Sequence, residues 1–169
     1  MMEKFNNIYR IPSARLERWD YGADAIYFVT ICTANHEQYF GNIDDGEMHL
    51  NAIGEIAHQY WIDITKYFPH VILDAHIVMP NHVHGIVIIE NNKLDIPEDD
   101  RKWKPGTLGV IINQYKRAVT ISARKNNGEF GWQSRFHDHI VRNNQSFQTI
   151  QEYIQENPLR WENDKFYNV

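Results

Sequence analysis

Two histidines separated by one aliphatic residue, His82-Val83-His84, open an apolar run in the middle of the chain. The β-branched residues that follow are typical of a strand, in which alternate side chains point to the same face. His82 and His84 are therefore predicted to be neighbours, with Val83 packed into the opposite face. Two imidazoles at this spacing can share one divalent metal ion through their free nitrogens. A bare His-x-His pair also fits two solvated histidines on an edge strand, so this pair alone does not establish a metal site.

A second group of reactive side chains lies near the C-terminus, in the sequence Gln-Glu-Tyr-Ile-Gln-Glu-Asn-Pro. Tyr153 and Asn157 are four residues apart, so they share one face of a predicted helix. The buried stripe of that helix consists of Phe147, Ile150 and Ile154. Tyr153 then lies at the edge of the stripe, where its hydroxyl can project toward a site. A half-buried helix tyrosine with only a packing role is the alternative that this pattern leaves open.

The sequence around both groups resembles a known family. Residues 79–85 read Met-Pro-Asn-His-Val-His-Gly, and residues 153–158 read Tyr-Ile-x-x-Asn-Pro. Both segments resemble the HUH single-strand transposases, in particular the REP-associated tyrosine transposases, which are similar to the transposases of insertion sequence 200. The resemblance extends from about Tyr21 to Trp161.

This resemblance implies that Tyr153 is the nucleophile and that His82, His84 and Asn157 hold a divalent metal ion, Mg²⁺ or Mn²⁺. The metal would polarise the scissile phosphate of DNA, and the tyrosine would form a covalent 5′-phosphotyrosine and free a 3′ hydroxyl. The expected activity is that of a metal-dependent transposase and endonuclease, which cleaves and rejoins single-stranded DNA at hairpin-containing, REP-like sequences. Rejoining would need no ATP, because the covalent linkage keeps the energy of the broken bond.

Two other functions remain open at this stage. One is a nucleic-acid-binding protein that recognises hairpins without catalysis. The other is a metal-dependent nuclease that uses activated water at His82 and His84, although acidic ligands are not evident near these histidines in the sequence.

Three further side chains could take part in such chemistry. Tyr115 is a rival nucleophile, because it is flanked by Lys116 and Arg117. It shares an apolar helical stripe, however, and core packing explains it better. His137 and His139 form a second same-face pair, which fits strand packing or an aid to substrate binding better than a second metal site.

The charge distribution favours a nucleic-acid partner more than the net charge does. The chain has a net charge of −5, yet residues 101–142 contain nine basic and two acidic residues. Phosphate binding depends on Lys and Arg, and aromatic side chains can stack bases. A solvated helix face would also hold several of these residues. The candidate DNA-binding residues are Trp103, Lys104, Lys116, Arg117, Arg124, Trp132, Arg135 and Arg142.

Hydrophobic periodicity predicts the order strand, hairpin, helix, strand, strand, helix, strand, helix after an N-terminal arm of residues 1–24. Without the hairpin and the last helix, this order is βαββαβ, a ferredoxin-like α+β fold with an antiparallel sheet and helices on one face. The last helix carries Tyr153, so we expect a C-terminal catalytic helix. The predicted ranges are strand 25–33, hairpin 38–50, helix 51–68, strands 71–79 and 82–90, helix 107–125, strand 132–142 and helix 147–156.

Length and composition predict one catalytic domain, HUH transposase-like, over residues 25–169. A chain of 169 residues with 43% hydrophobic and 23% charged residues is typical of a single globular domain. No apolar run approaches the ~20 residues that cross a bilayer, and the polar N-terminus does not resemble a signal peptide. We therefore expect a cytoplasmic protein without a membrane partner, as a monomer or a homodimer. The single cysteine, Cys32, is predicted to be a small buried hydrophobic residue.

Overall fold

The computed structural model describes Lys4–Phe5, Ile8–Tyr9 and residues 24–90 and 106–167. Most of the predicted N-terminal arm therefore lies outside the described residues. Its two described pairs form the short antiparallel strands β1 (Lys4–Phe5) and β2 (Ile8–Tyr9).

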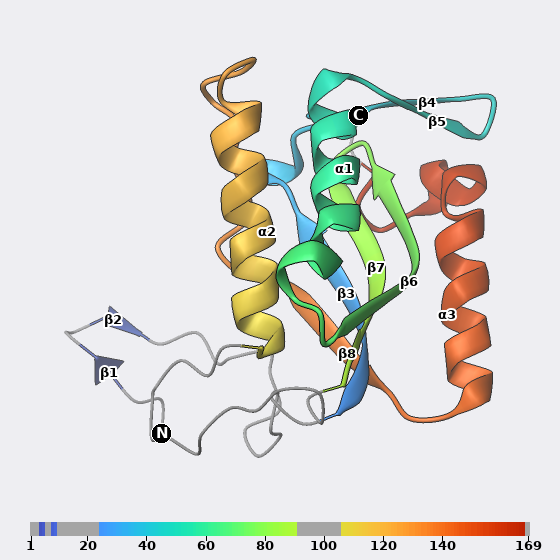
Figure 1. Cartoon of the computed structure of the whole chain (residues 1–169). Helices are drawn as coiled ribbons and strands as arrows, with labels where there is room; N and C mark the ends of the chain where they lie inside the picture. Colours follow the sequence, from blue (N-terminus) through green and yellow to red (C-terminus); the bar gives the residue numbers. More distant parts are fainter. Residues whose placement is uncertain (1–3, 6–7, 10–23, 91–105, 168–169) are drawn as a thin grey trace.

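The centre of the fold is an antiparallel sheet of four strands (Figure 1). The strands are β3 (Ala25–Cys32), β6 (Val71–Met79), β7 (His82–Ile89) and β8 (His137–Val141). They lie in the order β6-β7-β3-β8, so β3, the first of these four strands along the chain, lies between the third, β7, and the fourth, β8. This is the order of a ferredoxin-like sheet, and the predicted α+β class is confirmed.

Two helices, α1 (Ala52–Tyr67) and α2 (Leu108–Ala123), cover one face of the sheet (Figure 1). Each begins at a polar N-cap, because the Asn51 side chain accepts hydrogen bonds from two backbone amides of α1 and the Thr107 hydroxyl accepts one from α2. A third helix, α3 (Asn144–Glu156), packs against β6 and β7 on the other face and leads into the 3₁₀ helix η3 (Pro158–Asn163). The two helices of the predicted βαββαβ unit therefore cover one face as expected, and the additional C-terminal helix lies on the other face.

Alternation along the strands separates the two faces. On β3, Tyr27, Val29 and Ile31 are buried in the main core with α1 and α2. Phe28, between them, contacts the ring of Tyr153 on α3, with ring centroids 6.0 Å apart. The sheet thus has a core face under α1 and α2, and a site face toward α3.

One glycine sets how closely α1 approaches the sheet. Gly85 of β7 lies under the indole of Trp61 on α1, and a Cβ at this position would overlap the ring. Trp61 is fully buried and also packs edge-to-face against Tyr115 of α2, with ring centroids 5.3 Å apart. The glycine that follows the histidine pair therefore serves core packing.

The predicted hairpin forms a separate two-stranded sheet of β4 (Gly41–Asp44) and β5 (Glu47–Leu50), with the short 3₁₀ helix η1 (Ala34–His36) before it. Asp45 and Gly46 make its turn, both at positive φ.

Two predicted boundaries are wrong. The last strand is shorter than predicted, because Trp132 makes only an isolated bridge to Thr33 and regular pairing begins at His137. The final helix starts earlier, because the Asn143 side chain accepts a hydrogen bond from the backbone N–H of Ser146 and acts as the N-cap.

Candidate active site

The two histidines of the central motif lie on the site face of β7, an inner strand of the sheet. His84 is directly opposite Thr30 of β3, and His82 is opposite Cys32. Both are buried, with exposed fractions of 0% for His82 and 1% for His84, and their ring centroids are 4.4 Å apart. The alternative of two solvated histidines on an edge strand is therefore wrong. Val83 points into the core, as predicted.

Helix α3 brings the predicted nucleophile and the predicted third ligand to this pair. The hydroxyl oxygen of Tyr153 lies 3.4 Å from Nε2 of His84, and the ring centroids of these two residues are 5.3 Å apart. Asn157, one turn later on the same helix face, has an exposed fraction of 1%. The structure thus brings together all four residues that the sequence assigned to catalysis and metal binding.

An acidic residue that the sequence analysis missed completes the group. Asp164 follows η3, and its Oδ2 accepts hydrogen bonds from Asn157 Nδ2 at 3.0 Å and from the Tyr153 hydroxyl at 3.4 Å. Ligand atoms of His82, His84 and Asp164 all lie within 4.8 Å of one another. An acidic residue therefore does lie near the histidines in space, although none is evident near them in the sequence. No periodicity marked Asp164, and the available signal was the pair of acidic residues, Glu162 and Asp164, shortly after the Tyr-x-x-x-Asn motif.

Burial keeps both histidines neutral at ordinary pH. Desolvation lowers the pKa of His82 to about 4, against a smaller opposing effect of the Asp164 carboxylate. Desolvation, followed by the neighbouring His82, also lowers the pKa of His84 well below its usual value. A neutral imidazole has a lone pair for a metal ion, so these shifts favour metal binding.

The same burial disfavours the ionised form of the tyrosine. Desolvation, with the Asp164 carboxylate as the next cause, raises the pKa of Tyr153 to about 12. The hydroxyl is therefore protonated at neutral pH in the metal-free protein. A nearby positive charge would be needed to make this oxygen a better nucleophile.

The donor atoms of the site fit a divalent cation. Nε2 of His82 and Oδ1 of Asn157 are buried and have no hydrogen-bond partner among the described residues. A buried polar atom without a partner is costly unless something binds it. Two imidazole nitrogens together with a carboxylate oxygen form a set of ligand atoms that can bind a divalent metal ion. His82, His84 and Asp164 are the residues that would hold the ion, with Asn157 beside them.

The predicted DNA-binding residues do not form one surface with this site. Arg117 is exposed on α2, and Arg124 is exposed directly after it. Helix α2 covers the face of the sheet opposite to α3, the helix that carries Tyr153 (Figure 1). Lys116 is partly buried, and its ammonium group donates a hydrogen bond to the backbone oxygen of Gln133 at 2.7 Å. Trp103 and Lys104 lie outside the described residues.

Trp132 packs in an aromatic cluster. Its ring packs against Phe40, Phe130 and Tyr115 at centroid distances of 5.4, 5.3 and 5.9 Å, and its indole N–H donates to the backbone oxygen of Lys116. Tyr115 itself is 2% exposed, and its hydroxyl donates to the backbone oxygen of Ala57 at 3.0 Å. The packing interpretation of Tyr115 is therefore confirmed.

The edge strand β8 carries exposed groups nearer to the site. His137 and His139 are exposed and pair with Thr30 and Phe28 of β3, so they share the site face. Arg135, just before the strand, and Arg142, just after it, are also exposed. No acidic partner that would make the histidine pair a second metal site is found among the described residues.

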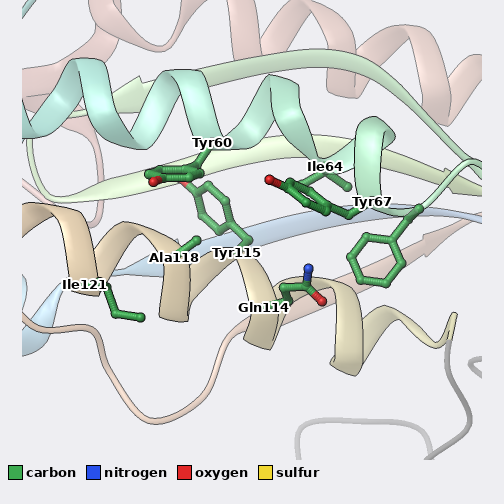
Figure 2. A pocket seen from close by; sticks show the side chains of 8 residues that line it. Tyr60, Ile64, Tyr67, Gln114, Tyr115, Ala118 and Ile121 are labelled. Carbon is green, nitrogen blue, oxygen red and sulfur yellow. The ribbon is translucent and has the colours of Figure 1, made fainter.

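A cavity of about 350 Å³ lies between α1 and α2, away from the tyrosine site. Tyr60, Ile64 and Tyr67 of α1 face Gln114, Tyr115, Ala118 and Ile121 of α2 across it (Figure 2). Its lining is mainly apolar, and it contributes no side chain to the group around Tyr153.

Comparison with solved structures defines the fold class. A REP-associated tyrosine transposase bound to a REP hairpin has a TM-score of 0.55 and 19% sequence identity, over 87% of this chain and 74% of that chain. The fold of this chain is thus similar to that of a REP-associated tyrosine transposase, the group that the sequence motifs resemble. A protein of Deinococcus radiodurans R1 is more distant, with a TM-score of 0.48 and 14% identity over 83% of this chain and 95% of that one.

Comparison with other sequences gives the family. No protein-family model matches the chain. An uncharacterized protein of Haemophilus influenzae is 40% identical over 178 residues, which cover 99% of each chain. This chain therefore belongs to the same family as the Haemophilus influenzae protein. In this chain, none of the described helices is long and apolar enough to span a membrane.

Proposed function

We propose that the protein is a metal-dependent transposase and endonuclease of single-stranded DNA that acts through a covalent 5′-phosphotyrosine at Tyr153. The observation that carries this proposal is the position of the Tyr153 hydroxyl, 3.4 Å from Nε2 of His84 and 3.4 Å from Oδ2 of Asp164. Three separate parts of the chain, β7, α3 and the segment after η3, meet at this hydroxyl. A tyrosine with only a packing role would not need this convergence of polar groups.

His82, His84 and Asp164 would hold the ion, and Asn157 would assist them. A bound divalent ion supplies positive charge that polarises the scissile phosphate and stabilises charge in the transition state. Mg²⁺ and Mn²⁺ are the ions expected for this reaction. The second imidazole nitrogens of both histidines are engaged by neighbours, Asn81 for His82 and Thr30 for His84. Such outer contacts fix the ring orientation.

Tyr153 is the nucleophile in this proposal. Its oxygen forms a bond to phosphorus, the bond between phosphorus and the 3′ oxygen breaks, and the 3′ oxygen leaves as a hydroxyl after it gains a proton. The hydrogen bond from Tyr153 to Asp164 gives the phenol proton an acceptor. Reversal of the same steps with a new 3′ hydroxyl rejoins the strand.

The proposed substrate is single-stranded DNA that contains a hairpin. The solved relative in fold is bound to a REP hairpin, and exposed Arg135, His137, His139 and Arg142 lie near the site on or beside β8. Basic side chains track phosphates, and imidazole rings offer stacking surfaces. Arg117 and Arg124 would contact DNA only if it wraps around to α2.

The test uses one hairpin-bearing DNA strand labelled at either end, in separate reactions with Mg²⁺ or Mn²⁺. The tyrosine becomes joined to the 5′ phosphate, so the 3′-labelled strand should migrate with the protein after denaturation. The 5′-labelled strand should appear as a shorter free product. Cleavage without a protein adduct would favour the nuclease that uses activated water. Binding without cleavage in either metal would favour the non-catalytic hairpin-binding protein.

A further inference from the structure

We propose that Asn81 is a positioning residue that holds His82 in the tautomer that can bind a metal ion. Asn81 lies in the turn between β6 and β7 and is fully buried. Its side-chain nitrogen donates to the backbone oxygens of His36 at 3.1 Å and Phe166 at 2.7 Å. Carbonyl oxygens only accept, so these two contacts identify the nitrogen of the amide and fix its orientation.

The amide oxygen of Asn81 then faces His82. Its Oδ1 lies 2.9 Å from Nδ1 of His82. An amide oxygen cannot donate, so Nδ1 must carry the hydrogen and donate it to Asn81. In the neutral ring, the other nitrogen, Nε2, therefore has the lone pair. This is the buried atom without a hydrogen-bond partner among the described residues.

His84 shows why this contact is special. Its Nδ1 lies 2.9 Å from the hydroxyl oxygen of Thr30, and a hydroxyl can either donate or accept. That contact is compatible with both tautomers of His84. The contact with Asn81 is compatible with only one tautomer of neutral His82. Asn81 therefore selects a tautomer of its histidine, and Thr30 does not.

The same amide connects the metal site to the C-terminal segment. Phe166, whose backbone oxygen it binds, packs its ring against His82 with centroids 4.7 Å apart. Asp164, two residues earlier, supplies the carboxylate of the site. Asn81 thus orients one candidate ligand through its oxygen and anchors the segment that delivers another through its nitrogen.

This inference rests on the proposed function only for its metal-binding part, so its first test uses metal-free protein. Long-range ¹H–¹⁵N spectra at about pH 8, above the ordinary histidine pKa, show which ring nitrogen carries the hydrogen. The His82 signals are assigned by their loss in His82→Gln. We expect the hydrogen on Nδ1. A hydrogen on Nε2 of His82 in the unsubstituted protein overturns the proposal, whatever the protein does to DNA.

Two substitutions separate tautomer selection from structural support. Asn81→Leu and Asn81→Asp both lose the two amide donors, but only Asp keeps an oxygen that accepts from Nδ1. We expect the Nδ1–H form of His82 to persist in the Asp variant and to lose its preference in the Leu variant. If the Leu variant does not fold, the spectra of the unsubstituted protein and of the Asp variant still decide the question.

Metal affinity gives the second readout. Mn²⁺ titration followed by electron paramagnetic resonance should show binding about 10- to 100-fold weaker in Asn81→Leu, the range for loss of an outer-shell partner. Asn81→Asp should retain more affinity. Tyr60→Phe, which removes the hydrogen bond to Ser122 on the other side of the sheet, controls for a general loss of stability. Equal losses in the Leu and Asp variants would assign Asn81 a purely structural role and overturn the proposal.

Discussion

Replacement of Tyr153 by Phe should abolish the covalent adduct at little expense to stability. The substitution removes one oxygen and keeps the ring, so the contacts with His84 and Phe28, at centroid distances of 5.3 and 6.0 Å, are retained. Both hydrogen-bond distances of the hydroxyl are 3.4 Å, beyond the usual range, so their net contribution is small. We expect a change in the free energy of unfolding within about 0.5 kcal/mol, the lower end for one hydrogen bond.

Tyr115→Phe is the matched control, and its expected effects are reversed. The Tyr115 hydroxyl is buried and donates to the backbone oxygen of Ala57 at a good distance of 3.0 Å. Its loss should lower the free energy of unfolding by about 1 kcal/mol. That loss corresponds to a decrease in Tm of about 2–4 °C for a domain of this size. Cleavage and adduct formation should remain, because Tyr115 lies on α2, which packs on the core face of the sheet.

The assay combines thermal unfolding, DNA binding and the end-labelled adduct gel for both variants. The expected pattern is that the more stable variant is inactive and the less stable variant is active. DNA affinity should be retained by both, because neither substitution removes a charge. An inactive Tyr115 variant with an active Tyr153 variant would refute the assignment of the nucleophile and move the chemistry to α2. Cleavage by Tyr153→Phe without an adduct would identify a hydrolase.

Three further variants test the site, the core and the basic surface. The free energy of unfolding of the metal-free protein should decrease as pH falls below about 6.5. Burial lowers the pKa of His82 and of His84 in the folded protein, so the unfolded chain binds more protons below that pH. The His82→Gln/His84→Gln double variant should show a flatter pH profile and no Mn²⁺ binding. Gly85→Ala should destabilise the protein by about 1–3 kcal/mol in urea unfolding, because the new methyl group overlaps an α1 indole; an unchanged midpoint would contradict that packing. Arg135→Ala/Arg142→Ala should make the logarithmic salt dependence of DNA binding shallower by about one unit per lost phosphate contact, and an identical slope would show that these side chains do not contact DNA.

Local patterns in the sequence determined the elements and the spacing of the reactive groups. Alternation put His82 and His84 on one face of a strand, and helical periodicity put Tyr153 and Asn157 on one face of a helix, as observed. These are properties of a few consecutive residues, so they can be read without knowledge of the tertiary structure. The order of the elements then restricted the topology to the ferredoxin-like arrangement that the sheet adopts.

Tertiary structure decided the contacts that neither local patterns nor the family resemblance indicated. The order of strands made β7 an inner strand, so the histidines are buried rather than solvated and their pKa values are lowered. Chain folding after η3 brought Asp164 to the site from a segment without periodicity, and the turn amide of Asn81 gained partners that are 45 and 85 residues away in sequence. The fold also places α2, which carries Arg117, across the sheet from Tyr153. Contacts between distant segments depend on packing of the whole chain, and local residue patterns do not encode them.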